Sequence, residues 1–240
     1  MISKEQIKKI RSLQQKKFRD IHQMFIIEGP KMIQEAINKA PESILEIFGV
    51  SERENFILPQ FQYQQITEKN LQQVSGLKNP QSQLAICQYL PKEEIKTDFI
   101  LAIDTVQDPG NLGTILRLAS WFGVKKIVAS KETVDCYNPK VVQASMGAIF
   151  TVQIEYVDLK TYLSNASLPI YGALLDGENI YTKSIERKGT LLLGNEGNGI
   201  HEDLIPLVNH RITIPQFGEG ESLNVAMATA ILLSEFSRPR

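Results

Sequence analysis

The sequence has few of the features that mark a secreted or membrane protein. Only two of its 240 residues are cysteines, Cys87 and Cys136, which is too few for a disulfide framework or a cysteine-based metal site. No apolar run is long enough to span a membrane, and residues 1–9 are too polar and charged for the core of a signal peptide. We therefore expect a cytoplasmic protein in a reducing compartment.

Several catalytic motifs are also missing. The GxGxxG loop of dinucleotide-binding proteins does not follow the first strand of either expected domain. The sequence has neither the GxxxxGK[ST] loop of P-loop NTPases nor the GxSxG elbow of serine hydrolases. Its three histidines, His22, His201 and His210, lack the spacing of metal ligands, so we expect no metal site.

Positive charge is concentrated at the start of the chain. Lysine and arginine number 26 against 27 acidic residues, and this balance argues against a protein that binds nucleic acid over its whole surface. Within the first 31 residues, however, eight basic residues accompany three acidic ones. Such a basic arm is typical of a phosphate-binding surface, but also of a solvated helix face, and charge alone does not separate the two.

Residues 1–90 predict a small α/β domain. Ser3 and Gln6 form a capping box, and Ile7, Ile10 and Leu13 follow at helical spacing, with basic residues on the opposite face. Strand and helix patterns then alternate up to a last strand over residues 83–89. Residues 91–97, PKEEIKT, are charged and lack apolar periodicity, so we expect a linker there.

Residues 98–240 predict a second domain with an alternating strand and helix pattern. Short apolar strands separated by helices indicate a parallel sheet covered on both faces, with ligands bound beyond the carboxyl ends of the strands. The expected strands are Phe99–Asp104, Lys126–Ala129, Thr151–Glu155, Ile170–Leu174, Thr190–Leu193 and Arg211–Ile214. The expected helices are Leu112–Phe122, Pro139–Met146, Leu159–Asn165, Glu202–Leu207 and Ser222–Phe236.

The loop after the first of these strands is rich in turn formers and opens a helix. Backbone N–H groups at such a helix start favour anionic or polar ligands. Arg117 lies about one and a half turns into the helix, which we take to be close enough to the loop to share a site with Asn111. Taken alone, this stretch favours a simpler interpretation, namely a tight turn followed by a solvated arginine.

Two later loops are similarly polar. Residues 194–199, GNEGNG, contain three glycines, which allow a close approach of backbone and ligand. In the loop over 214–224, Ser222 is a good N-cap for the last helix. That helix is apolar around nearly its whole circumference, which indicates a partner subunit or a tail tucked into the fold. Asn224 at its start is either a satisfied cap or a buried polar group that needs a partner.

Three stretches occur in the order and spacing of a known family. DPGNLGTILRLASWFG (108–123), LLLGNEGNGI (191–200) and IPQFGEGESLNVAMATAILLSEF (214–236) resemble the three motifs of the SpoU/TrmH family of RNA ribose 2′-O-methyltransferases. QIKKIRSLQQKKFRD (6–20) and MFIIEGPKMIQEAI (24–37) resemble its small N-terminal RNA-binding domain, which is similar in fold to the ribosomal proteins L30e and L7Ae. The resemblance covers nearly the whole chain.

The resemblance implies a fold, a cofactor and a set of site residues. The implied fold is α/β, with a C-terminal SPOUT-type parallel sheet tied in a trefoil knot and an N-terminal L30e/L7Ae-like RNA-binding domain. The implied cofactor is S-adenosylmethionine, and the implied assembly is a homodimer in which Arg117 acts across the interface. The polar active-site positions are Asn111, Arg117, Glu196, Ser222 and Asn224. The cofactor-binding positions are Gly194, Glu196, Gly199, Ile214, Leu223 and Asn224. The basic residues for RNA docking are Lys8, Arg11, Lys16, Lys17 and Arg19.

The implied reaction is transfer of a methyl group to a ribose 2′-OH in structured RNA. Family accounts give Arg117 the role of base, but a guanidinium almost always stays protonated. We therefore expect Arg117 to orient the substrate and stabilise developing charge, while Glu196 or a water molecule accepts the proton. The N-terminal domain favours ribosomal RNA over transfer RNA as the substrate.

Three other functions were weighed against this one. A transfer-RNA 2′-O-methyltransferase would share the same catalytic motifs. A non-catalytic RNA-binding protein on the same fold would be expected to lose part of the polar set, and none of it is lost. A small-molecule enzyme on a Rossmann-like sheet is disfavoured by the missing dinucleotide motif and by the basic N-terminal domain.

Overall fold

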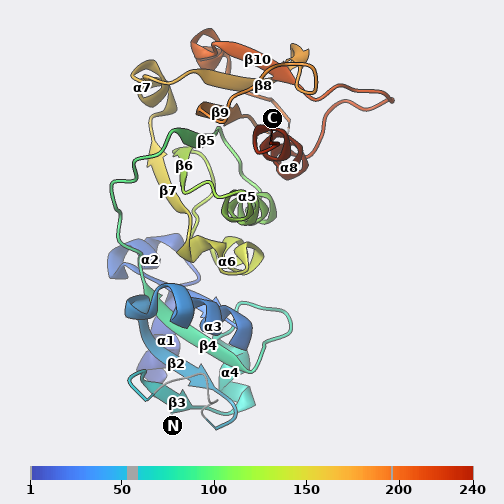
Figure 1. Ribbon diagram of the computed structural model, residues 1–240. Helices are drawn as coiled ribbons and strands as arrows, with labels where there is room; N and C mark the ends of the chain where they lie inside the picture. The colour runs from blue at the N-terminus through green and yellow to red at the C-terminus, as the bar shows by residue number, and fades with distance from the viewer. Residues whose placement is uncertain (1, 53–58, 196, 240) are drawn as a thin grey trace. The chain divides into compact units, whose positions relative to one another are not determined.

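The computed structural model describes residues 2–52, 59–195 and 197–239 (Figure 1). The chain forms two compact units. The first consists of Met1–Lys92 and Asp135–Phe150, and the second of Glu93–Val134 and Thr151–Arg240. These units differ from the predicted ranges in one respect, because residues 135–150 were expected in the second domain and pack with the first.

The first unit is built on a four-stranded sheet in the order β1-β4-β2-β3. Strand β4 is antiparallel to β1 and β2, while β2 and β3 are parallel. The strands are β1 (Met24–Glu28), β2 (Ile44–Gly49), β3 (Tyr63–Gln65) and β4 (Gln83–Gln88). The helices from the first 92 residues are α1 (Lys4–Ser12), α2 (Lys16–His22), α3 (Pro30–Lys39), α4 (Glu68–Val74) and the 3₁₀ turn η1 (Pro41–Ser43).

Alternating side chains give this sheet a hydrophobic core on each face. Phe25 and Ile27 of β1 lie in one core with Ile33 of α3, whereas Ile26 lies in the other core with Ile10 of α1. This alternation follows from the two-residue period of a strand. The sheet is therefore covered by α3 on one side and by α1 and α4 on the other.

A segment from the middle of the chain completes the first of these cores. It contains α6 (Pro139–Ser145) and η2 (Ala148–Phe150), and its Val142 and Ile149 are buried with Phe25. Burial of these side chains on β1 explains why residues 135–150 belong to the first unit. The sequence pattern of α6 predicts an apolar face, but it does not predict which of the two sheets that face packs against.

The second unit is a six-stranded sheet in the order β10-β8-β9-β5-β6-β7, and every strand pair is parallel. This confirms the predicted α/β class and the parallel sheet, whereas the trefoil knot stays a prediction. The strands are β5 (Phe99–Ile103), β6 (Lys126–Ser130), β7 (Gln153–Val157), β8 (Ile170–Asn179), β9 (Gly189–Leu193) and β10 (His210–Thr213). The helices are α5 (Pro109–Trp121), α7 (Leu159–Ser164), η3 (Glu202–Leu207) and α8 (Val225–Phe236).

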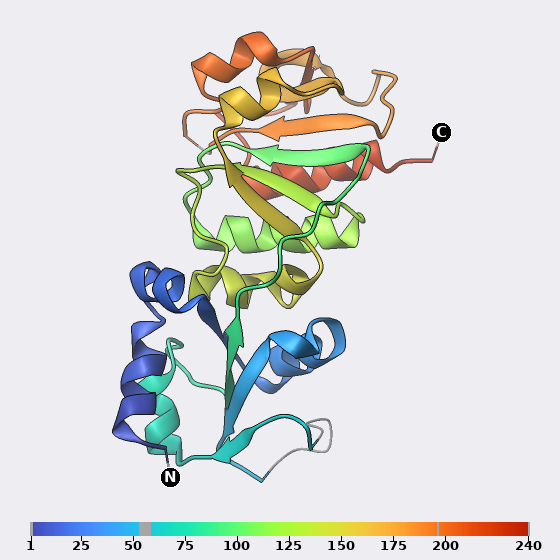
Figure 2. The ribbon, with the colours of Figure 1, turned by 90° about the vertical axis from the view of Figure 1, so that its left-hand side faces the viewer.

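Helices cover both faces of this sheet. Helices α5 and α8 pack together on one side, and α7 and η3 lie on the other, as Figures 1 and 2 show. Ala102 and Leu192 of the central strands pack beneath Leu159 and Leu163 of α7. Within the described residues, no helix has the length and hydropathy of a membrane-spanning segment.

Several elements differ from their predicted bounds or form, among them α5, η3 and β8. Helix α5 begins at Pro109, three residues before the predicted start, because Asp108 caps it by accepting from the Asn111 N–H. Residues 202–207 form a 3₁₀ helix rather than an α-helix, and Pro206, which lacks an N–H donor, lies within it. Strand β8 runs to Asn179, five residues beyond the predicted end.

Candidate active site

The three polar loops singled out in the sequence begin at the carboxyl ends of parallel strands. They follow β5, β9 and β10, and β5 pairs directly with β9 in the register Ile103↔Leu193. Parallel strands end at the same edge of a sheet, so the three loops emerge on one side of this unit. The sequence predicted this placement from the strand pattern alone.

Hydrogen bonds join the loop after β5 to the loop after β9. The Asp104 N–H donates to the Leu193 carbonyl at 2.9 Å, and the Asn195 side-chain amide donates to the Thr105 carbonyl at 2.8 Å. The buried Asp104 carboxylate accepts from the His201 N–H at 2.8 Å and from the Thr105 hydroxyl at 2.9 Å. Asp104 and Asn195 therefore hold the two loops together.

Sequence analysis did not identify Asp104 and Asn195 as site residues. The sequence offered one sign of their role, because each is a polar residue that closely follows a buried strand, where ligand-binding loops begin. Neither residue belongs to the predicted catalytic or cofactor-binding sets. Their contacts assign them to holding the loops in place.

The glycine loop after β9 is closed on itself. Asn195 and Gly199 exchange two backbone hydrogen bonds, of 2.8 and 3.0 Å, and Gly199 has a φ of +69°. A Cβ atom on Gly194 would lie well inside van der Waals contact with the backbone of Gly199 and Ile200. Only glycine fits at position 194. At this point the loop therefore presents backbone groups, and no side chain, to its surroundings. Glu196 lies outside the described residues.

Asn224 connects the starts of α8 and α5. Its Oδ1 caps α8 by accepting from the N–H groups of Ala226 at 3.0 Å and Met227 at 3.3 Å. Its Nδ2 donates to Oδ1 of Asn111 at 3.0 Å. Of the two predicted alternatives, a satisfied cap and a buried polar group, Asn224 is the cap, and its side chain is exposed. It also has a side-chain partner, Asn111, that lies 113 residues away in sequence. The predicted N-cap, Ser222, is exposed and lies two residues before the observed cap.

The predicted cofactor-binding residues of the third loop lie on either side of it. Ile214 directly follows β10 and is half-buried, while Leu223 directly precedes Asn224 and is 51% exposed. Both residues were predicted to bind the cofactor through backbone groups, and these groups lie at the two ends of the loop.

Arg117 does not share a face of α5 with Asn111. Six residues separate them, so Arg117 lies about 120° around the helix and ~9 Å along its axis from Asn111. Arg117 is exposed, whereas Asn111 is half-buried beside Asn224. That the two residues share a site therefore stays a prediction, and the offset around the helix agrees with the expectation that Arg117 acts across a dimer interface.

The predicted RNA-docking residues belong to the first unit, and four of the five are exposed. Lys8 and Arg11 lie on α1, and Lys16 and Lys17 begin α2. The predicted capping box at the start of α1 is present, with Ser3 accepting from the Gln6 N–H and the Gln6 side chain accepting from the Ser3 N–H. Lys16 forms an exposed ion pair with Asp20 at 2.7 Å. These cations remain accessible to a phosphate backbone.

Arg19 is the exception among these residues. Its side chain is only 2% exposed, and its guanidinium pairs with the Asp135 carboxylate at 2.6 Å. It also donates to the carbonyls of Leu13 and Gln14, at 3.0 Å each. This corrects the assignment of Arg19 to RNA docking, because a buried guanidinium with a carboxylate and two carbonyl partners has no face left for phosphate.

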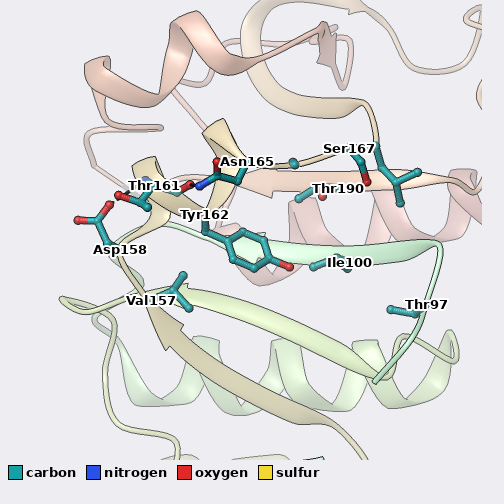
Figure 3. A pocket seen from close by; sticks show the side chains of 11 residues that line it. Thr97, Ile100, Val157, Asp158, Thr161, Tyr162, Asn165, Ser167 and Thr190 are labelled. Carbon is teal, nitrogen blue, oxygen red and sulfur yellow. Dashed lines mark hydrogen bonds between the residues drawn. The ribbon is translucent and has the colours of Figure 1, made fainter. Parts of the chain in front are cut away.

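A separate cavity of about 550 Å³ lies beneath α7 (Figure 3). Tyr162 of α7, Ile100 of β5 and Thr190 of β9 line it, together with residues of the segment after α7. None of the predicted site residues lines this cavity. The part of the chain that the structure describes also holds no group of three or more His, Cys, Asp or Glu side chains placed to bind a metal ion.

Comparison with known proteins identifies the family. Residues 98–234 match the model of the SpoU rRNA methylase family, and residues 4–85 match that of the MRM3-like substrate binding domain. The chain belongs to the SpoU rRNA methylase family. The first match contains the three hydrogen-bonded loops, and the second contains the exposed basic residues of α1 and α2.

Individual SpoU relatives match the chain over almost its full length. One is the 23S rRNA (guanosine(2553)-2′-O)-methyltransferase RlmP of Bacillus subtilis, 31% identical over 95% of this chain and 94% of the relative. Among solved structures, a protein from Porphyromonas gingivalis described as an RNA methyltransferase of the TrmH family has a TM-score of 0.86 at 36% identity and covers 98% of both chains. An AdoMet-bound rRNA methyltransferase from Sinorhizobium meliloti has a TM-score of 0.85 at 28% identity, covering 98% of this chain and 95% of its own.

Proposed function

We propose that this chain transfers a methyl group from S-adenosylmethionine to a ribose 2′-OH of ribosomal RNA. Family membership and the full-length relatives named as rRNA methyltransferases support the reaction and the substrate class. The observation that carries the proposal to particular residues is the 3.0 Å hydrogen bond between Asn224 and Asn111. It brings the first and third family motifs together at the edge of the sheet where ligands bind.

The glycine loop fits the proposed cofactor. A Cβ atom has no room at Gly194, so the loop presents backbone donors and acceptors without a side chain in the way. The backbone groups of Gly194, Gly199, Ile214 and Leu223 would hold the adenosine part. When bound, S-adenosylmethionine supplies a methyl group already activated on a sulfonium. The protein is left to orient the acceptor and to remove its proton.

Arg117 acts on the substrate rather than as the base. Its guanidinium stays protonated and presents a planar fork that can bind a phosphate through two hydrogen bonds. It holds the phosphate beside the target ribose and favours the developing alkoxide. Glu196 or a water molecule accepts the proton. Ser222, Asn111 and Asn224 supply polar groups around the acceptor.

Arg117 serves the site of a second copy of the chain. On its own α5, Arg117 lies about 120° around the helix from Asn111, and an Arg117 from a second copy completes the site. The start of α8 offers a surface for that second copy, because Met227 of α8 is 60% exposed and Leu223, just before the helix cap, is 51% exposed. A homodimer covers these side chains and completes the site. The substitution Met227→Glu should shift the protein from dimer to monomer in light scattering.

The first unit docks the RNA. Its match to a substrate-binding domain supports this role, and Lys8, Arg11, Lys16 and Lys17 supply exposed positive charge. Phosphate contacts of this kind position the enzyme without reading sequence, and they make binding weaken as salt rises. Ribosomal RNA resides in the cytoplasm of a bacterial cell, and we place the reaction there. Cys87 and Cys136 are buried thiols with no disulfide between them, which suits that compartment.

The test is methyl transfer from radiolabelled S-adenosylmethionine to 23S ribosomal RNA, with the modified ribose mapped by resistance to alkaline cleavage. We expect label at one ribose and none on a DNA copy of the same sequence, because DNA lacks the 2′-OH. Arg117→Lys should lose most activity while still binding cofactor, whereas Arg238→Lys, a conservative change at an exposed arginine of the same unit, should retain it. Near-normal turnover by Arg117→Lys would contradict the role given to Arg117.

The same assay separates the two alternatives. Label on transfer RNA but not on ribosomal RNA would identify a transfer-RNA enzyme. Binding of RNA without label on either substrate would indicate a non-catalytic RNA-binding protein.

A further inference from the structure

The only tryptophan in the sequence is almost fully exposed. Trp121 is the last residue of α5, and its side chain is 82% exposed. Indole is a large apolar ring that normally contributes to a core or an interface. An exposed tryptophan on a well-formed helix is therefore a candidate contact for another molecule, and its surroundings decide which one.

Three basic residues neighbour Trp121 on α5, in the chain or at the adjacent Phe122. Arg117 lies one turn earlier on the same face of α5, because residues four apart on a helix are neighbours. The Arg187 guanidinium donates to the carbonyl of Phe122, the residue next to Trp121, and the exposed Lys125 follows four residues after the tryptophan. Across the described ranges, none of these three cations forms an ion pair. The end of α5 thus combines an aromatic face with uncompensated positive charge.

We propose that Trp121 is a stacking platform for an unpaired base of the substrate RNA, next to the nucleotide that is methylated. Aromatic side chains beside a cationic track are the features that bind single-stranded nucleic acid. Arg117 holds a phosphate beside the target ribose in the proposed function, and Trp121 lies ~6 Å further along the same helix face. A neighbouring base can therefore reach the ring while its phosphate meets Lys125 or Arg187. This inference rests on the proposed function and assigns the residue that selects an unstacked nucleotide.

A second copy of the chain is a poorer partner for this surface. Arg117 reaches the site of the second copy, but a symmetric contact centred on Trp121 itself would bring Lys125 and Arg187 toward the same cations of the other copy, and like charges repel. The exposed Met227 of α8 and Leu223 just before that helix carry no such charge and suit the second copy better. RNA supplies both the flat apolar base and the negative phosphates that the end of α5 lacks.

The single tryptophan makes the proposal directly testable. In the free protein, Trp121 fluorescence should show solvent-exposed emission and quenching by acrylamide. Titration with single-stranded oligoadenylate, and separately with 23S ribosomal RNA, should quench the emission and protect it from acrylamide. The same oligonucleotide in a duplex should quench it far less, because its bases are already stacked. Emission shielded in the free protein and unchanged by bound RNA would overturn the proposal in favour of a subunit contact.

Variants supply the second readout. Trp121→Ala should raise the KM for 23S ribosomal RNA about tenfold, which corresponds to ~1.4 kcal/mol, at unchanged affinity for S-adenosylmethionine. Trp121→Phe keeps a ring and should stay within about threefold of the wild-type KM. The matched control is Leu175→Ala, at another apolar side chain that is 79% exposed, and it should leave both constants unchanged. A wild-type KM in Trp121→Ala would refute the stacking role.

Failure of this inference differs from failure of the proposed function. If the wild type labels ribosomal RNA but neither the fluorescence nor the KM responds as described, only the role of Trp121 is rejected. If the wild type transfers no label to RNA, the proposed function is rejected, and the stacking role with it.

Discussion

The buried ion pair between Arg19 and Asp135 should contribute strongly to the stability of the first unit. Their side chains are 2% and 11% exposed, and the guanidinium reaches the carboxylate through Nη2 at 2.6 Å and Nε at 3.2 Å. Removing one partner of such a pair leaves a buried charge and typically costs 3–5 kcal/mol. Arg19 keeps two carbonyl acceptors, so we expect Asp135→Ala to lose about 3 kcal/mol, at the lower end of that range.

Urea unfolding followed by circular dichroism would measure this loss. Lys16→Ala is the matched control on the same helix, because the ion pair of Lys16 with Asp20 is 64% and 46% exposed and should contribute less than about 1 kcal/mol. Hydrogen exchange would locate the effect, and the amides of α2 and α6 should lose protection first. A loss below about 1 kcal/mol in Asp135→Ala would refute the reasoning.

A double substitution tests the cause of the loss. Arg19→Met with Asp135→Leu removes both charges and leaves only apolar groups of similar size. Replacement of a buried ion pair by packed apolar side chains is often close to neutral. The double variant should therefore be more stable than Asp135→Ala alone. If it is less stable, the hydrogen bonds of Arg19 to the carbonyls of Leu13 and Gln14 matter more than its charge.

Three further predictions concern the loops and one buried carboxyl. Gly194→Ala should cost about 1–3 kcal/mol of stability and weaken S-adenosylmethionine binding in calorimetry, because its Cβ would meet backbone; unchanged binding would contradict this. Asn224→Ala should lose about 1 kcal/mol of stability, because the helix cap is missing, and should also lose methyl transfer. Asn224→Asp keeps the cap but not the donor to Asn111, so it should lose methyl transfer alone. Burial raises the pKa of Glu28 above its ordinary value, despite donors from the Ser75 hydroxyl and the Gly76 N–H. A carboxyl whose pKa is raised in the folded state contributes stability at low pH, and this contribution is lost as the pH rises through that pKa. Over that pH range the urea midpoint of the wild type should therefore fall relative to that of Glu28→Gln. A midpoint that rises instead would refute the assignment.

Much of the secondary structure could be predicted because its causes are local. The apolar run from Phe99 and the helical spacing from Leu112 to Ala119 predicted β5 and α5, and the helix boundary moved only because Asp108 caps it. The capping box of Ser3 and Gln6 lies within four consecutive residues, and it formed as predicted. These features depend on neighbours in sequence, so periodicity and residue type were sufficient.

Features that depend on distant contacts could not be predicted. Arg19 looked like one more cation of a basic arm, but its partner Asp135 lies 116 residues away. The all-round apolar pattern of α8 did not show that Leu233 is buried while Met227 is exposed. Sequence spacing gave no distance between Asn111 and Asn224, which lie 113 residues apart in the chain and are joined by a hydrogen bond.

By itself, the sequence determined which segments become strands and helices, that the strands of the second unit are parallel with polar loops after them, and the family to which the motifs belong. Those properties follow from hydrophobic period, turn chemistry and motif order, which every short window of the chain records. Only the tertiary structure decided that Arg19 is buried, that residues 135–150 complete the core of the first unit, and that Arg117 and Trp121 share an exposed face. Burial and pairing arise from groups far apart in the chain, and no local pattern records which distant surface a side chain will meet.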